Sequence, residues 1–115
     1  MDAQHKSLLK SDEDRMQDVK DYIDKNYSSG LKVKTLAKLF GYSDSTFERH
    51  FLAVFHTLPE DYIRHYRLTQ AMNLLTSRSV PVSQVCYEVG YSRGGFVKAF
   101  KKKFGRPPIF YNRVK

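Results

Sequence analysis

The chain has 115 residues, 41% of them hydrophobic and 14% aromatic, and a formal net charge of +8 at pH 7. This length suits one compact domain or two small joined lobes, and the sequence shows no apolar run of membrane-spanning length and no signal-peptide pattern. Cys86 is the only cysteine, so an internal disulfide is excluded and we expect a reducing, cytoplasmic location.

The charge is distributed unevenly along the chain. Residues 1–30 carry five basic and seven acidic groups, for −2, whereas residues 31–115 carry fifteen basic and five acidic groups, for +10. No acidic residue follows Glu88. Such a basic segment favours a polyanionic partner, and a basic surface without a partner is the simpler alternative.

The first part of the chain has the spacing of two helices. Residues 1–11 are polar and unpatterned, and we expect a flexible lead-in there. A helix is predicted from Asp12, because three acidic residues suit a helix N-terminus and apolar residues then recur at helical spacing. A second apolar stripe begins at Val33 and ends before Gly41, where glycine can take the left-handed conformation of a helix end.

The next residues complete a helix-turn-helix pattern. Ser43 is placed to cap a third helix, whose buried stripe includes three aromatic rings, Phe47, Phe51 and Phe55. Their helical spacing favours core packing over stacking on bases. Pro59 suits the first turn of a further helix, which runs to Ser77 and would be about 28 Å long.

Residues 33–62 recur without a gap at 82–111, an offset of 49 (82 − 33). Nine residues at core, turn and cap positions are identical: Val33, Gly41, Tyr42, Ser43, Phe47, Phe51, Phe55, Pro59 and Tyr62 recur as Val82, Gly90, Tyr91, Ser92, Phe96, Phe100, Phe104, Pro108 and Tyr111. A second copy of the unit is therefore predicted, followed by a short helical turn around Ile109, Phe110 and Val114. No segment alternates like a strand, so we predict an all-α fold of about seven helices.

No set of residues has the spacing of a catalytic or metal site. The four histidines have no cysteine or carboxylate at metal-ligand spacing, and no catalytic triad, carboxylate pair or phosphate-binding glycine loop is present. Cys86 takes the repeat position of Ala37 and is predicted to be a small buried residue. We therefore expect no enzymatic activity, no metal and no cofactor.

The outer face of the second helix in each unit is the remaining candidate site, because that helix enters the major groove in helix-turn-helix proteins. Arg49 is the leading candidate, since arginine can donate two hydrogen bonds to guanine; a phosphate contact or a solvated side chain is the alternative. The predicted base-reading residues are Ser45, Thr46, Glu48, Arg49, Arg93, Val97 and Lys98. Phosphate contacts are predicted from Ser43, Ser92, Lys101, Lys102, Lys103 and Arg106.

The two copies differ on this outer face. Gly94 and Gly95 remove side chains from the second copy, whereas three consecutive lysines follow at residues 101–103. We therefore expect the first unit to supply more of the sequence reading and the second more of the electrostatic attraction.

One stretch of the sequence resembles the signature of the AraC/XylS family. Its matching residues are Arg67-Leu68…Ala71…Leu74-Leu75, then Val82…Val85-Cys86…Val89-Gly90-Tyr91, Phe96…Phe100 and Gly105…Pro107-Pro108, and the resemblance extends over roughly residues 15–113. It implies two helix-turn-helix lobes, each a homeodomain-like three-helix unit, joined by a long helix. It also implies bacterial transcription regulation, usually activation, by recognition helices at about 44–55 and 93–104 that enter successive major grooves.

These observations predict four segments: a lead-in at 1–11, a helix-turn-helix subdomain at 12–58, a linker helix at 59–77 and a second subdomain at 78–115. We expect a sequence-specific regulator on an asymmetric double-stranded DNA site of about 15–20 base pairs, with RNA polymerase as a candidate second partner. The chain is too short for the sensing domain of most family members, so it is either a stand-alone regulator or a C-terminal piece. A non-specific basic nucleic-acid binder and a protein-interaction module for an acidic partner are the alternatives.

Overall fold

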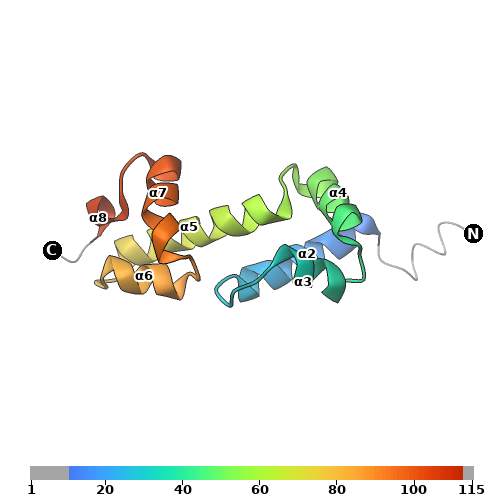
Figure 1. The fold of residues 1–115 in the computed structure, drawn as a ribbon, viewed down its shortest axis with the longest axis horizontal. Helices are drawn as coiled ribbons and strands as arrows, with labels where there is room; N and C mark the ends of the chain where they lie inside the picture. The colour runs from blue at the N-terminus through green and yellow to red at the C-terminus, as the bar shows by residue number, and fades with distance from the viewer. Residues whose placement is uncertain (1–10, 113–115) are drawn as a thin grey trace, which may run out of the picture. The chain divides into compact units, whose positions relative to one another are not determined.

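A computed structural model describes residues 11–112, and within that range the chain forms seven helices and no strand (Figure 1). The helices are α2 (Asp12–Asn26), α3 (Val33–Leu39), α4 (Asp44–Phe55), α5 (Pro59–Ser77), α6 (Val82–Glu88), α7 (Arg93–Phe104) and α8 (Pro108–Tyr111). The predicted all-α class is confirmed, and so are the predicted bounds of α4, α5 and α7. The expected lead-in, except Ser11, and Val114 lie outside the described residues. Each of the seven described helices is too short or too polar to span a membrane.

The described chain divides into two compact units. Unit 1 comprises residues 11–26 and 31–62, and unit 2 comprises residues 27–30 and 63–112. Most of α5, expected to be a linker, belongs to unit 2, and so does the short segment 27–30, which lies between two helices of unit 1 in the sequence.

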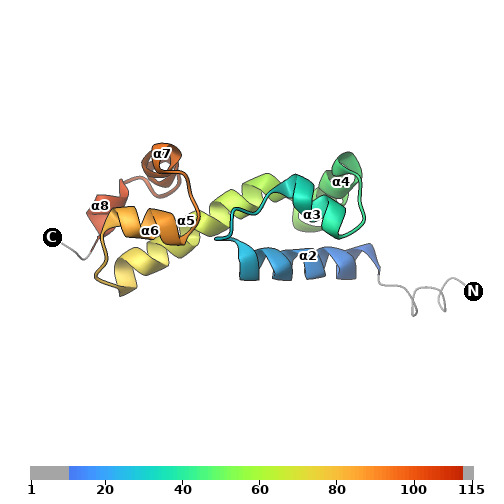
Figure 2. The ribbon, with the colours of Figure 1, turned by 60° about the horizontal axis from the view of Figure 1, so that its bottom comes forward.

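Unit 1 is a three-helix unit with an apolar core. α2, α3 and α4 each supply the stripe that the helical spacing predicts, and the two rings Phe47 and Phe51 are fully buried. The remaining buried core residues are Met16, Val19, Ile23, Leu36 and Ala37. Figures 1 and 2 show α3 and α4 gathered on α2 within this unit. Burial of Phe47 and Phe51 confirms that they are core residues, whereas Phe55 is half-buried, and the opposite face of α4 is left for other contacts.

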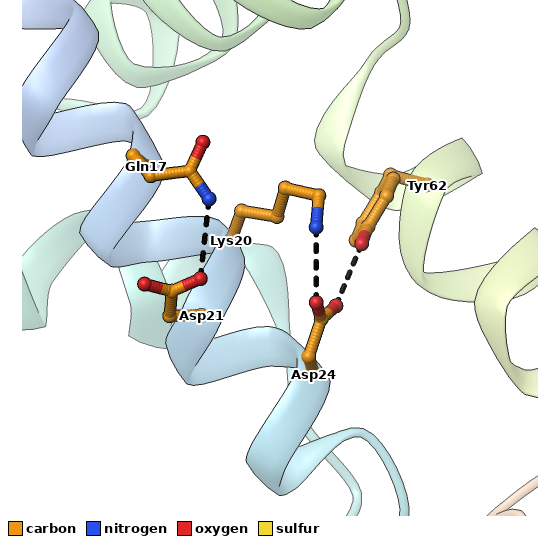
Figure 3. A network of polar contacts seen from close by, with 5 residues as sticks. All are labelled: Gln17, Lys20, Asp21, Asp24 and Tyr62. Atoms are coloured by element: carbon orange, nitrogen blue, oxygen red, sulfur yellow. Dashed lines mark hydrogen bonds and ion pairs between the residues drawn. The ribbon is translucent and has the colours of Figure 1, made fainter.

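Polar contacts tie the first turn of α5 to α2 within unit 1. The Tyr62 hydroxyl donates to the Asp24 carboxylate at 2.6 Å, and the Lys20 ammonium lies 3.0 Å from the same carboxylate. Figure 3 shows Lys20 and Tyr62 both pointing at Asp24, with a separate hydrogen bond between Gln17 and Asp21 on α2. The beginning of α5 is therefore a part of unit 1.

Unit 2 repeats the same arrangement, with α5 as its first helix. Its core consists of Leu68, Ala71 and Leu75 from α5, Val85 and Cys86 from α6, Val89 from the turn, and Phe96 and Phe100 from α7. Cys86 is buried, as its repeat position predicts, and its thiol donates to the Tyr91 carbonyl at 3.3 Å. Burial raises the pKa of this thiol, and the nearby charge of Arg93 offsets part of that effect.

The segment 27–30 packs against unit 2 through a hydrogen bond, a ring contact and a close backbone approach. Arg67 on α5 donates from Nε to the Tyr27 carbonyl at 2.8 Å, and the Tyr27 and Tyr66 rings meet edge to face with centroids 5.1 Å apart. Gly90 approaches Ser28 so closely that a Cβ atom there would lie 2.8 Å from the Ser28 carbonyl oxygen. Gly90 also has a φ of +75°, so glycine is required twice over at this turn.

Candidate nucleic-acid interface

α4 presents an exposed polar face opposite its buried ring stripe. Ser45, Glu48 and Arg49 are exposed, and Thr46 is half-buried. Among residues 11–112, no side chain forms a hydrogen bond or an ion pair with the Arg49 guanidinium. An arginine with all of its donors uncommitted, on the outer face of a rigid helix, has the chemistry to read a guanine edge or to bind a phosphate.

α7 presents the corresponding face in unit 2. Arg93, Val97 and Lys98 are exposed, and a Cβ atom added at Gly94 would meet nothing within 4 Å. Lys98 occupies the repeat position of Arg49 (98 − 49 = 49), so both units place a basic side chain at the same point of the outer face. The open space at Gly94 means that packing does not require glycine at this position, where the outer face of α7 lacks a side chain.

The lysines at 101–103 do not form one cluster. Lys101 and Lys102 are exposed and have no side-chain partner among the described residues. The Lys103 ammonium lies 3.3 Å from Nδ1 of His65 and 5.5 Å from the Phe104 ring centroid. Lys103 is exposed as well, but its ammonium is directed toward His65 on α5, and its repeat position in unit 1 is held by the half-buried Val54 (103 − 49 = 54). Two of the three lysines therefore remain available for phosphates.

Arg106 is also engaged within the protein. It follows Gly105, which ends α7 in the left-handed conformation, and its guanidinium lies 4.7 Å from the Phe110 ring centroid. A cation over an aromatic face is attracted by the ring quadrupole, so this arginine is oriented by α8. The predicted phosphate set thus separates into uncommitted side chains on α7 and side chains held by neighbouring elements.

The two predicted helix caps behave differently. Ser43 accepts the Thr46 backbone N–H at 3.4 Å and caps α4. Ser92 stands at the N-cap position of α7, but its side chain makes no capping bond, so the predicted repeat of the serine cap is wrong in this respect. The reason lies in the first turn of α7, where the Gly95 N–H is taken by the Ser92 carbonyl oxygen at 3.3 Å. Both serines are exposed, as a phosphate contact requires.

A residue that the sequence analysis overlooked holds the turn before α4. Arg15 on α2 donates from Nε to the Tyr42 hydroxyl at 2.8 Å and from a terminal nitrogen to the Phe40 carbonyl, and its guanidinium lies 4.9 Å from the Tyr42 ring centroid. The Tyr42 ring in turn contacts Phe47 and His50 on α4, with centroids 6.0 and 5.4 Å apart. Arg15 therefore fixes the turn from which the outer face of α4 begins.

Unit 2 has a matching arginine in a different role. Arg67 directly precedes Leu68, the first residue that α5 contributes to the core of unit 2, as Arg15 directly precedes Met16 in unit 1, but Arg67 donates to the Tyr27 carbonyl. A second nitrogen of Arg67 is buried with no hydrogen-bond partner among the described residues, and burial lowers the pKa of this guanidinium while Tyr91 offsets part of the shift. Burial also raises the pKa of Tyr91, against the charges of Arg64 and Arg67. Both arginines stand directly before the first residue that their helix contributes to the core of its unit, and this shared position could have indicated them.

The described residues hold no grouping of three His, Cys, Asp or Glu side chains that could bind a metal ion. What they do hold is two copies of a helix-turn-helix, each with an exposed face on its third helix that is polar on α4 and basic on α7. This architecture defines a double helix-turn-helix protein, a class that contacts DNA through those third helices.

Comparison with known proteins places the chain within that class. A family model described as "Helix-turn-helix domain" matches residues 36–113. Regulatory protein SoxS of Escherichia coli (strain K12) is 33% identical over 97 residues, which cover 84% of this chain and 91% of SoxS. The chain belongs to the AraC/XylS family of helix-turn-helix transcription regulators, whose members bind DNA in a sequence-specific manner and in many cases activate transcription.

Solved structures show the same fold. The DNA-binding domain of AdpA, a global transcriptional factor determined in complex with a target DNA, is 25% identical, with a TM-score of 0.80 and coverage of 84% of this chain and 87% of that one. The C-terminal domain of AraT, a response regulator from Geobacillus stearothermophilus, is 25% identical, with a TM-score of 0.81 and coverage of 88% and 85%.

Proposed function

We propose that this protein regulates transcription by inserting α4 and α7 into successive major grooves of an asymmetric duplex site. We also propose that it acts in the cytoplasm and as an activator. The observation that supports the proposal is a pair of basic side chains at equivalent positions, Arg49 and Lys98, which lie on the outer faces of the two third helices and have no side-chain partner within residues 11–112. Covalent duplication supplies the two DNA-binding helices that many helix-turn-helix proteins obtain by dimerising.

Unit 1 is proposed to carry most of the base reading. Arg49 would donate to a guanine edge and Glu48 would accept from a cytosine amine, while Ser45 and Thr46 contact bases nearer the start of α4. The beginning of α4 is held by the Arg15 contact to Tyr42, so these side chains start from a fixed turn. Fixed geometry favours discrimination between bases, because a misplaced donor loses its hydrogen bond.

Unit 2 is proposed to supply more of the electrostatic attraction. Lys98, Lys101 and Lys102 are exposed on α7, whose first turn has no acidic residue. Phosphate contacts of this kind release counterions and strengthen binding to any sequence. Arg93 and Val97 remain as the base contacts of this helix, the latter through a thymine methyl group.

In-vitro selection of bound duplexes from a random pool tests the proposal. We expect a preferred site of about 15–20 base pairs with two unlike halves, one of them more sharply defined. Competition at fixed salt between a selected and a random duplex then measures specificity. Equal affinity for both would leave a non-specific nucleic-acid binder as the better description.

RNA polymerase is proposed as the second partner, since the family's activators act on transcription. Recruitment can be measured as the increase in polymerase retained on a promoter fragment that carries the selected site. A protein that binds the site yet changes neither polymerase retention nor transcript level would not be an activator on that fragment.

A further inference from the structure

The end of unit 2 carries an exposed apolar surface that the DNA-binding proposal does not use. We define the α8 patch as Arg106, Ile109 and Phe110. Ile109 and Phe110 are 64% and 59% exposed, although both lie within the short helix α8. The Arg106 guanidinium covers part of the Phe110 ring at 4.7 Å. The sequence analysis placed both apolar residues in a helical turn, and the structure leaves them facing solvent.

Unit 1 shows that this surface is not required by the fold. The same motif recurs at the start of α5, where a buried proline begins the helix and a tyrosine packs on the last ring of the core, with a 5.8 Å centroid separation in both units. At the positions of Ile109 and Phe110, unit 1 has Glu60 and Asp61 (109 − 49 and 110 − 49). Acidic residues are favourable in a helix's first turn, so unit 2 has exchanged a favourable charged pair for exposed apolar side chains.

Charge indicates what would cover the patch. Residues 93–112 include Arg93, Lys98, Lys101, Lys102, Lys103 and Arg106 and no acidic residue. A second copy of the chain would bring two such basic regions together, which like charges oppose. Ile109 has no flat face for a base, and one face of Phe110 is already taken by Arg106, so a nucleic acid fits poorly.

We propose that the α8 patch is a docking surface for an acidic protein segment whose apolar side chains cover Ile109 and Phe110 and whose carboxylates pair with Arg106. This interaction goes beyond DNA binding and does not depend on which duplex the protein selects. Apolar anchors surrounded by complementary charge are the usual composition of a protein–protein contact of modest size.

A defined peptide titration tests the proposal on the whole chain. The probe is a synthetic amphipathic helix of Glu and Leu, about sixteen residues long or roughly four turns, and the control peptide replaces each Leu by Ser. With isotope-labelled protein, we expect the Glu/Leu peptide to shift the Ile109 and Phe110 resonances at sub-millimolar concentration, on the order of the affinity of weak interfaces. The Glu/Ser peptide should bind at least roughly tenfold more weakly.

Variants identify the surface. Ile109→Ser with Phe110→Ser keeps the net charge and should weaken Glu/Leu peptide binding roughly tenfold, while the affinity for a selected duplex stays unchanged. Tyr87→Ser is the matched control, because Tyr87 is a more exposed hydrophobic of the same unit, at 84%. Unchanged thermal melting of both variants would show that the folds are intact.

Four results would overturn the proposal. They are equal binding of both peptides, equal loss in the Tyr87→Ser control, concentration-dependent self-association that the double serine variant abolishes, and a fall in duplex affinity caused by that same variant. A fall in duplex affinity would assign α8 to the DNA contact. Self-association would identify a second copy of the chain as the occupant of the patch. Failure of DNA binding itself would be visible in the wild-type duplex titration, without the peptide.

Discussion

Replacing Gly90 by alanine tests how closely segment 27–30 packs in unit 2. Gly90 has a φ of +75°, and an added Cβ would lie 2.8 Å from the Ser28 carbonyl oxygen and 3.0 Å from its carbonyl carbon. Gly41 holds the repeat position in unit 1 with a φ of +80°, and an added Cβ there would meet nothing within 4 Å. The two positions have the same left-handed backbone conformation, which an alanine would strain equally, and they differ in the contact to Ser28. Each variant is therefore the control for the other.

The expected costs follow from that difference. A non-glycine residue in the left-handed region costs about 1–2 kcal/mol, which is the full effect expected for Gly41→Ala. At Gly90 the methyl group must also displace backbone atoms of Ser28, and forced overpacking adds about 1–3 kcal/mol. We therefore expect Gly90→Ala to lower the free energy of unfolding by about 2–5 kcal/mol.

Native-state hydrogen exchange is the suitable assay, because it reports the free energy of opening at individual amides. Amides of α3 report on unit 1 and amides of α6 on unit 2. Gly41→Ala should lower protection in α3, and Gly90→Ala should lower protection in α6 by a larger amount. Equal costs at the two positions would refute the close packing of Ser28 on Gly90.

Four further outcomes are expected. Arg49→Ala should weaken binding to the selected duplex by about 1–3 kcal/mol and relax preference at one base pair, whereas uniform weakening on all duplexes would mean a phosphate contact. Lys101→Gln with Lys102→Gln should reduce the slope of log K against log salt by up to about two, and an unchanged slope would place both lysines away from DNA. His56→Gly should stabilise unit 1 by about 1 kcal/mol in urea unfolding, because His56 ends α4 at a φ of +59°; no gain would mean that the imidazole compensates. Burial raises the pKa of Tyr91 above its ordinary 10.0, so the stabilisation from its neutral phenol should be fully present below pH 10.0 and be lost as the pH rises through the higher pKa of the folded state. Tyr91→Phe should flatten this loss, and the same pH profile in the variant would contradict the reasoning.

The helices and the core were predictable because they depend on local periodicity. Apolar residues three and four apart can share a core only in a helix, so the stripe around Phe47 predicted both an element and its buried face. Gly41 and Ser43 marked the turn, since a left-handed residue and a cap have few alternatives. The same reasoning located unit 2 through its repeated rings.

The full extent of the repeat was not predictable from a gapless comparison. Arg15 and Leu36 are 21 residues apart (36 − 15), whereas their counterparts Arg67 and Val85 are 18 apart (85 − 67). The first link is longer by three residues, so the match between α2 and α5 is lost at any single offset. The longer link contains residues 27–30, which the structure assigns to unit 2. A loop that joins two helices of one unit gives no local signal that it packs in another.

The separate positions of the basic side chains also required the structure. In the sequence, Lys101, Lys102 and Lys103 form one run, and nothing local distinguishes the third from the others. All three are exposed, but Lys103 lies against His65, whereas its two neighbours have no side-chain partner within residues 11–112. Charge composition therefore predicted a basic helix, but which of its side chains are uncommitted depends on tertiary neighbours. The base-reading assignments themselves remain predictions.

The differences between the two units carry the functional argument, because the shared scaffold removes folding as their explanation. Arg49 in unit 1 corresponds to Lys98 in unit 2, and the exposed Leu52 corresponds to Lys101, at positions where neither side chain enters the core. A guanidinium can bind a base edge in two places, whereas an ammonium acts as a point charge. Two faces built this way would not prefer the same base sequence. A selected site with two identical halves would contradict this reasoning, even if both helices were found in grooves.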